Sequence, residues 1–188
     1  MALASIQANP RLLQGDVYRD VPFLESADEH DGTITVSTIE FPLVVVLTQD
    51  CDLLQDTNVR FNAKPGQNQD KFLFSVLVAP IYVAKHVYDG THLSDLPQTM
   101  RVGINNSSSV SSLIKQNEIP RYHFLSFPPA IQIPDAIIDF KHYFSVGVGY
   151  LNKERSAKYV CSIEVLYRER LTQRFSNFLS RIGLPDAE

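Results

Sequence analysis

A series of short segments with the pattern of β-strands most constrains how this chain folds. Residues 16–23, DVYRDVPF, alternate between two faces, and 43–48, LVVVLT, form the short apolar run of a buried central strand. The segment 71–84, KFLFSVLVAPIYVA, has the strongest strand pattern, and Pro80 is expected to limit its far end to an edge or a bulge. Short strands separated by turn residues predict a mainly β fold.

Turn and loop signals separate these strands. Asp31-Gly32 is a hairpin turn signal, and the polar stretch Glu25–His30 is expected to close the first strand before it. The polar segment Gln55–Asp70 predicts a long loop. Further strands are expected at 33–40, Arg121–Phe127, Ile137–Phe140, Tyr143–Leu151 and Ala157–Ile163, the last two joined by a turn at Asn152–Ser156.

Two helices are expected. A short one covers 107–117, where serine can cap the first turn and apolar residues form a stripe. A longer amphipathic helix closes the chain over about 164–182. Its apolar stripe recurs at helical spacing and consists of Leu171, Phe175, Phe178, Leu179 and Ile182.

Length and composition favour one domain. The chain has 188 residues, 44% of them apolar, which is enough for one core. We therefore expect a single domain over 1–188, with a compact β-barrel or strongly curved sheet over about 14–163, inserted loops, and the C-terminal helix packed on it. No apolar run is long enough to span a bilayer, and the N-terminus lacks the pattern of a secretory signal. Cys51 and Cys161 make no disulfide framework, so we expect a reduced, cytoplasmic protein without a membrane partner.

Charge is unevenly distributed along the chain. Residues 1–60 carry a net charge of −7, whereas 153–181 carry +4. The overall charge of −4 disfavours indiscriminate DNA binding but leaves room for a local basic strip. The asymmetry also suits a contact between two copies of the chain.

Three segments in the first 85 residues share a pattern with one known family. They are Gly15-Asp16-Val17-Tyr18, the stretch 42–50 with its proline, apolar run and Gln-Asp, and Val76–Ile81. In this order they resemble the MazF/PemK/Kid toxin superfamily, whose fold is an SH3-like barrel with a C-terminal helix. The resemblance implies such a barrel in a bacterial toxin–antitoxin or phage-defence setting.

The same resemblance bears on activity. Members of the family are mostly sequence-specific endoribonucleases that need no metal or cofactor, because the RNA's own 2′-hydroxyl attacks. They use an arginine beside the proline and a threonine or serine at the end of the later strand. Phe41 and Tyr82 stand at those positions here. The resemblance therefore implies a barrel with altered catalysis that binds RNA or a protein partner.

The segment TQDCD follows the buried strand directly, at a strand end where sites are often built. Asp50 and Asp52 can act as a carboxylate pair, for proton transfer or for a metal. Alternatively, Cys51 is a nucleophile if a histidine such as His86 or His123 reaches it. The structural alternative is an Asx turn with a buried cysteine.

Arg19 shares a strand face with Val17 and Val21. This is unusual for a charge unless it pairs with a carboxylate such as that of Asp50 or Asp52. An arginine there can also bind phosphate. In an active endoribonuclease, Arg19 would hold the phosphate, Asp50 or Asp52 would be the base, and Thr48 would position the RNA. The candidate catalytic residues are thus Arg19, Thr48, Asp50, Cys51 and Asp52.

The last helix offers two further surfaces. Arg170, Arg174 and Arg181 share one flank and form a candidate strip for nucleic acid. Its apolar face is a candidate docking surface for a protein partner or a second copy. The sequence thus leaves open an RNA- or protein-binding barrel, an active metal-independent endoribonuclease, an adaptor docking through its C-terminal helix, and a metal-dependent hydrolase.

Overall fold

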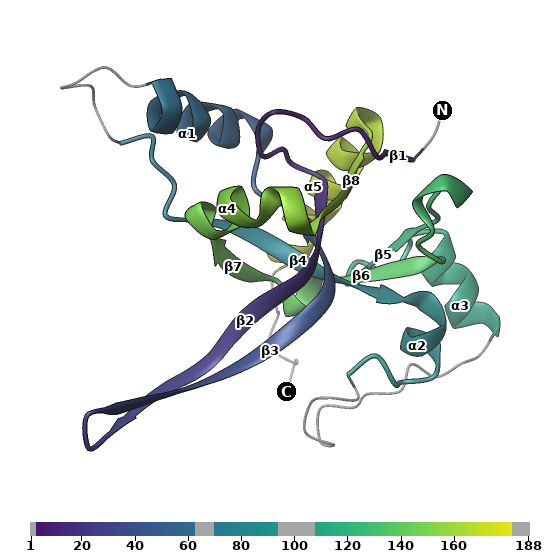
Figure 1. Ribbon diagram of the computed structural model, residues 1–188. Coiled ribbons are helices and arrows are strands. Elements are labelled where there is room, and N and C mark those ends of the chain that lie inside the picture. The colour runs from purple at the N-terminus through teal and green to yellow at the C-terminus, as the bar shows by residue number, and fades with distance from the viewer. Residues whose placement is uncertain (1–2, 63–69, 94–107, 182–188) are drawn as a thin grey trace, which may run out of the picture.

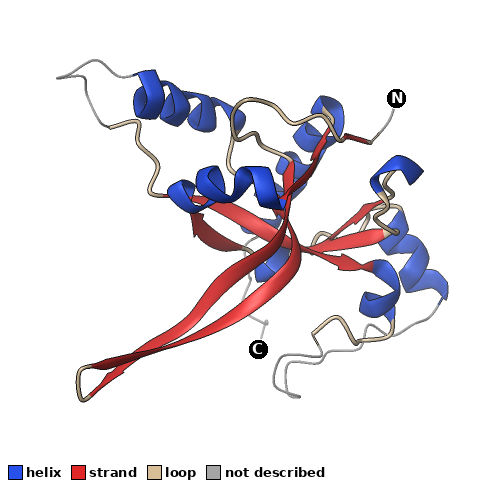
Figure 2. Cartoon of the chain, in the orientation of Figure 1, coloured by secondary structure: helices blue, strands red, loops and turns tan. Residues whose placement is uncertain are grey.

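A computed structural model describes residues 3–62, 70–93 and 108–181. Its strands are β1 (Ala4–Ser5), β2 (Asp16–His30), β3 (Thr33–Val46), β4 (Ser75–Val83), β5 (Tyr122–Leu125), β6 (Ala136–Asp139), β7 (Phe144–Gly147) and β8 (Tyr159–Ile163). Its helices are α1 (Asp50–Asn62), α2 (Ala84–Tyr88), α3 (Ser108–Lys115), α4 (Val148–Lys158) and α5 (Val165–Leu179), with short 3-10 turns η2 (Pro129–Ile131) and η3 (Phe140–His142). Figures 1 and 2 show the strands as one twisted sheet with helices around it.

The mainly β fold with a C-terminal helix is confirmed, but the sheet does not close into the expected barrel. Its strand order is β1-β8-β2-β3-β4-β6-β5, with β7 paired to β4, and all pairs are antiparallel. The two ends, β1 and β5, do not pair with each other. The reason lies in β4, whose residues 75–78 pair with β7 and 81–83 with β6. Pro80 lies in this central strand, where its neighbour on one side changes from β7 to β6.

Strands β2 and β3 form a hairpin that projects from the rest of the molecule (Figure 1). Asp31 and Gly32 have φ angles of 50° and 75°, as a two-residue hairpin turn requires, so the predicted turn is confirmed. The polar stretch Glu25–His30 does not close the strand, contrary to expectation. It continues β2, because residues 27–30 pair in register with Thr33–Val36 of β3, all of which are β-branched.

Each face of the sheet carries a core. Val17 and Val45 pack on one face, and Tyr18 and Val44, their neighbours in the strands, pack on the other. The helices complete these cores with Leu171, Phe175 and Phe178 of α5 on the first face, and Leu53 of α1 and Leu151 of α4 on the second.

The alternation of β2 changes at Asp20, whose φ is 52°. Arg19 and Asp20 are exposed, and Val21 joins the core of Tyr18 instead of that of Val17. The expectation that Arg19 shares a buried face with Val17 is therefore wrong, because a left-handed residue rotates the strand at this point.

Helix α1 occupies 50–62, where the sequence indicates a turn and the start of a long loop. Its acidic first turn suits the positive end of the helix dipole. Leu53 and Asp56 are buried, and Arg60 forms an ion pair of 2.7 Å with Asp56 one turn earlier. Because so few residues of α1 are buried, its sequence has no clear apolar repeat that would indicate a helix.

Helix α4 replaces the turn expected at Asn152–Ser156 and parts of both flanking strands. It buries only Val148 and Leu151, so its sequence also lacks a clear apolar stripe. The remaining positions are mostly polar, and they include Glu, Lys and Arg, which have a favourable helix propensity. The chain thus crosses from β7 to β8 by a helix.

The predicted C-terminal helix is confirmed as α5, and α3, β5 and β6 also form where the sequence predicts them. Leu171, Phe175 and Phe178 of α5 pack on the sheet. Ile182, the last residue of the predicted stripe, lies outside the described residues. No helix in the described part of the chain is long and apolar enough to cross a membrane.

Candidate functional site

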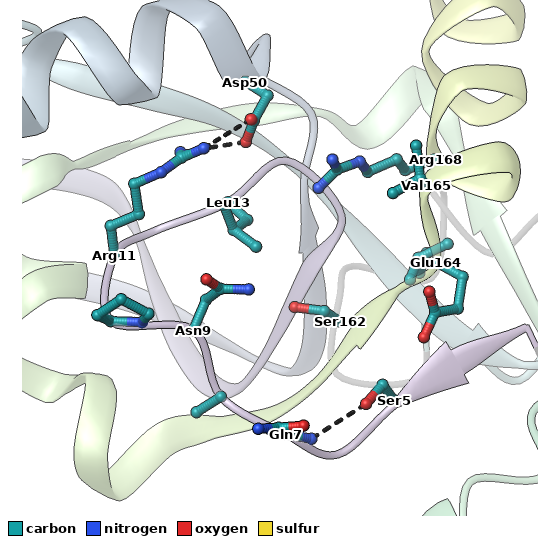
Figure 3. Close-up of a pocket in the computed structure, with 13 residues that line it drawn as sticks. Ser5, Gln7, Asn9, Arg11, Leu13, Asp50, Ser162, Glu164, Val165 and Arg168 are labelled. Atoms are coloured by element: carbon teal, nitrogen blue, oxygen red, sulfur yellow. Dashed lines mark hydrogen bonds and ion pairs between the residues drawn. The ribbon is translucent and has the colours of Figure 1, made fainter.

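A polar cavity of about 510 Å³ lies where the N-terminal segment, the first turn of α1 and the junction of β8 with α5 meet (Figure 3). A volume of this size suits a small ligand or a nucleotide. The polar side chains that converge there come from three distant parts of the sequence. Among them are Gln7, Asn9, Arg11, Asp50, Glu164 and Arg168.

Arg11 and Asp50 form a bidentate ion pair on one wall of the cavity. Nη1 of Arg11 lies 3.2 Å from Oδ1 of Asp50, and Nη2 lies 2.7 Å from Oδ2. The two side chains are 20% and 30% exposed, so the pair remains open to a ligand. Two parallel hydrogen bonds also fix the plane of the carboxylate.

The junction between β3 and α1 positions Asp50. The backbone N–H of Leu77 donates to the Thr48 hydroxyl at 2.7 Å, which extends the contact of β3 with β4 past the end of the strand. Asp50 then begins α1, where the free N–H groups of the first turn favour a carboxylate. The predicted catalytic residue Thr48 thus has a backbone partner in β4.

Gln14 links this cavity to α5. Its Nε2 donates to the carbonyl of Leu47 at 3.0 Å and to the hydroxyl of Thr172 at 2.7 Å. Arg168 of α5 donates a long hydrogen bond of 3.5 Å to the Gln14 carbonyl, and its guanidinium points across the cavity toward Asp50 (Figure 3). This is the one hydrogen bond of the Arg168 side chain within the described ranges, so most of its N–H groups remain for a ligand.

The Asp50 carboxylate is held in its ionised form. Burial by itself raises the pKa of an acid, but the hydrogen bonds and charge of Arg11, together with Arg168 and the Gln14 N–H, lower the pKa of Asp50 overall. A carboxylate with a lowered pKa accepts hydrogen bonds well but is a weak proton base. The cavity therefore suits binding better than proton abstraction.

Asp16 supports the cavity from behind and is completely buried. Its carboxylate accepts hydrogen bonds from the Leu13 N–H at 2.9 Å and from the Ser162 hydroxyl, and Arg155 lies 3.3 Å away. Burial raises the pKa of Asp16 in spite of these partners. Because Leu13 and Ser162 both line the cavity, Asp16 holds two of its walls together.

Of the TQDCD segment, the structure brings Asp50 into the cavity and leaves Cys51 and Asp52 exposed on α1. Residues one and two positions apart on a helix do not face each other, so Asp50 and Asp52 form no carboxylate pair. The Asx turn with a buried Cys51 is likewise wrong. The Cys51 thiol lies near the side chains of Gln49 and Asp52, at 3.6 and 3.8 Å, and not beside a histidine.

Arg19 is not the partner of Asp50, contrary to expectation. It is exposed on β2, and Asp50 pairs instead with Arg11, 39 residues earlier in the chain. No motif or periodicity marks Arg11 in the sequence. Only the fold of the N-terminal segment along β8 and α1 brings it to the site.

The predicted strip of Arg170, Arg174 and Arg181 does not form a common basic surface. Arg181 lies over the ring of Phe178, at 3.9 Å from the ring centre. Arg170 is exposed. Arg174 turns inward and donates to three backbone carbonyls, those of Asn117, Ile119 and Tyr122.

We expect Arg174→Ala to lower the free energy of unfolding by about 2 kcal/mol, because buried carbonyls lose a charged donor. Urea denaturation at neutral pH measures this loss. Arg170→Ala, on the same helix but exposed, is the control and should change stability by no more than about 0.5 kcal/mol. Equal effects of the two substitutions would contradict the structural role of Arg174.

A second group of polar side chains has no signature in the sequence. Asp139 of β6, which is 1% exposed, receives two hydrogen bonds from Arg121 at 2.8 and 2.6 Å. Nδ1 of His142 lies 3.5 Å from Asp139 and 3.0 Å from the Tyr82 hydroxyl. Burial lowers the pKa of His142. Arg121 balances the charge of Asp139. His142 is then free to hold the Tyr82 hydroxyl in place through their hydrogen bond.

Phe41 and Tyr82, the two positions at which the expected resemblance would place a catalytic arginine and threonine, lie close to each other. Both line two cavities, of about 240 and 320 Å³. The smaller cavity has mainly aromatic walls, with Phe23 and Phe144 beside them. The two side chains therefore contribute to a mainly apolar surface.

His123 is buried between β6 and α5, and its Nδ1 has no hydrogen-bond partner among the residues that the structure describes. Burial, and to a smaller extent Arg174 and Arg170, lower the pKa of His123 to about 3. His123 thus stays neutral in the folded protein well below the pH at which an ordinary histidine takes up a proton.

We expect His123 to destabilise the protein in acid. In the unfolded chain His123 has a pKa of about 6.5, so above this pH it is neutral in both states and costs the folded protein no stability. As the pH falls from 6.5 toward 3, the unfolded state takes up a proton that the folded state cannot, and the free energy of unfolding decreases. The loss approaches about 1.4 kcal/mol per pH unit for one group, and urea denaturation across this range measures it. His123→Phe should flatten the profile, whereas a substitution of His30, exposed on the hairpin, should not. An unchanged profile in His123→Phe would contradict the assignment.

Comparison of the chain with known protein families finds none that matches, and no curated protein matches it. The resemblance to the MazF/PemK/Kid superfamily therefore stays a prediction. Over the described ranges, no group of three or more His, Cys, Asp or Glu side chains is arranged to hold a metal ion.

Proposed function

We propose that the protein binds single-stranded RNA in the polar cavity and does not cut it. The observation that carries the proposal is the convergence of Arg11 and Arg168 on Asp50 in an open cavity. Guanidinium groups recognise phosphate oxygens through paired hydrogen bonds. Because Arg168 has N–H groups to spare, we assign it the phosphate.

The remaining polar walls suit a nucleobase. The amides of Gln7 and Asn9 and the carboxylate of Glu164 line the cavity. Amide and carboxylate groups read the hydrogen-bonding edges of unstacked bases, as in single-stranded RNA. Asp50 and Glu164 also balance the charges of the two arginines, which favours a nucleotide with base contacts over a highly charged polyphosphate.

The ion pair of Asp50 with Arg11 supports binding without cleavage. Cleavage without a metal needs a base for the 2′-hydroxyl, and Asp50 is tied to Arg11 with a lowered pKa. Arg19 and Thr48, the other residues of the nuclease hypothesis, lie outside the cavity lining. An altered, RNA-binding relative of the MazF-like toxins, cytoplasmic and in a toxin–antitoxin or phage-defence setting, remains the proposal that the resemblance implies.

An adaptor role through α5 has less support. The apolar residues Leu171, Phe175 and Phe178 already pack on the sheet, so this face is not free for a partner. Leu166 and Leu179 are exposed on the same helix, but single exposed apolar residues are normal on protein surfaces. The polar cavity therefore provides the better supported function.

A binding and cleavage assay tests the proposal. Fluorescently labelled, mixed-sequence RNA is titrated with the protein, and the same RNA is examined on gels with EDTA and then with Mg²⁺. We expect salt-dependent binding and intact RNA in both conditions. Metal-free cutting that is lost in Asp50→Ala would show an endoribonuclease, cutting only with Mg²⁺ would show a metal-dependent hydrolase, and absence of binding would contradict the proposal.

A further inference from the structure

The arm is defined as residues 20–40. Its base is covered, because Val21 is buried and Phe23 packs against the core, but within the described ranges no further element covers residues 24–38 (Figure 1). Residues 24–30 and 33–38 are all exposed. β2 pairs with β8 only at 16–18, and β3 pairs with β4 only at 44–46, so the arm has two open strand edges. A two-stranded ribbon alone is marginally stable in water, and a further strand would stabilise it.

The two edges of the arm differ in character. β3 contributes Thr33–Ile39, in which six of the seven residues are β-branched and none is charged. β2 contributes the acidic side chains of Glu25, Asp28 and Glu29. Charged side chains protect a strand edge from pairing, whereas an uncharged β-branched edge is a template for another strand. The β3 edge is therefore the one suited to binding.

The charge of the arm identifies the chemistry of its partner. The arm contains no lysine or arginine and six acidic residues, Asp20, Glu25, Asp28, Glu29, Asp31 and Glu40. Like charges disfavour the pairing of two arms from two copies of the chain, and they also disfavour nucleic acid. A basic protein segment complements this charge.

An aromatic cavity of about 240 Å³ lies at the base of the arm. The rings of Phe23 and Phe41 there are 6.5 Å apart, and Phe41 stacks on Phe144 at 5.2 Å. Glu25 and Ile39 of the arm line the same cavity. A strand added to the ribbon projects alternate side chains onto this face. An apolar side chain of that strand can therefore enter the cavity, where it lies beside Glu25 of the arm.

We propose that the β3 edge of the arm binds an extended, basic protein segment as an added strand, with one apolar side chain of that segment in the aromatic cavity. Backbone hydrogen bonds to 33–39 provide the pairing, the acidic residues of the arm select a basic partner, and the cavity sets the register. The proposal uses no residue of the polar cavity and is independent of RNA binding.

A synthetic peptide of alternating lysine and valine, with one phenylalanine, serves as the probe for the full-length chain. We expect it to shift the backbone amide resonances of 33–39 in NMR spectra. The combined variant Glu25→Lys, Asp28→Lys, Glu29→Lys should weaken binding about tenfold or more, since it removes the charge complementarity. Because exposed positions are changed, circular dichroism should show an unaltered fold.

Two peptides with the same side chains but N-methyl groups on alternate residues separate strand pairing from simple charge attraction. One set of methyl groups faces the arm and should abolish binding, whereas the other faces solvent and should leave it intact. Equal binding of both peptides, shifts only at residues that lie outside both the arm and the aromatic cavity, or no binding of the parent peptide would overturn the proposal. Dimerisation of the chain that shifts the same amides without peptide would also overturn it, in favour of a second copy.

Discussion

Replacing Arg168 with alanine is expected to weaken RNA binding roughly tenfold to a hundredfold while leaving the fold intact. The Arg168 side chain makes one long hydrogen bond within the described residues, so the folded state loses little. A hydrogen bond from a charged group contributes about 1.5–3 kcal/mol, which corresponds to this range of affinity. Fluorescence anisotropy with a short single-stranded RNA measures the ratio.

Arg170→Ala is the matched control, because Arg170 lies on the same helix, has the same charge and is absent from the cavity. It should leave affinity nearly unchanged. In Arg168→Ala, the slope of log affinity against log salt should become shallower by about 0.7, as expected for one lost contact to a single strand. Equal losses in both variants would show general attraction to α5 and would contradict a specific phosphate contact.

Asp16→Ala is expected to lower the free energy of unfolding by about 3–5 kcal/mol, because it removes one partner of a buried ion pair. The substitution leaves Arg155, whose side chain is 14% exposed, without its carboxylate. It also leaves the Leu13 N–H and the Ser162 hydroxyl without their acceptor. Chemical denaturation followed by circular dichroism measures the change.

Asp20→Ala provides the comparison, since Asp20 lies on the same strand and is exposed. Its effect should stay within about 1 kcal/mol, allowing for its unusual backbone angle. At urea concentrations where Asp16→Ala is still folded, we also expect weaker RNA binding, because Asp16 holds two walls of the cavity. A loss of stability no greater than that of Asp20→Ala would contradict the role of Asp16.

The parts of the fold that the sequence predicts correctly are those with local signals. Asp31-Gly32 supplies the positive φ angles of the hairpin turn, and the apolar stripe of α5 is visible at helical spacing. Helices α1 and α4 escape prediction because each buries few residues and is polar elsewhere. The closed barrel is wrong because nothing local shows that β4 changes partners along its length.

The candidate site is less predictable than the fold. Asp50 is identifiable, because it follows a buried strand directly. Its partner Arg11 and the opposite group Arg168 are not, because the contacts join residues far apart in the chain. Arg174 shows the reverse case, since its position on a helix flank suggests a surface role but its guanidinium binds backbone carbonyls. Only the fold decides which arginine lines the cavity.

Photocrosslinking shows where on the protein the RNA is bound. RNA that contains 4-thiouracil is bound to the full-length protein, irradiated, and the crosslinked peptides are identified by mass spectrometry. We predict crosslinks in the segments 5–13 and 162–168, which contribute most of the lining of the polar cavity, with a reduced yield in Arg168→Ala. Crosslinks confined to the arm or to the exposed flank of α5 around Arg170 would contradict this prediction.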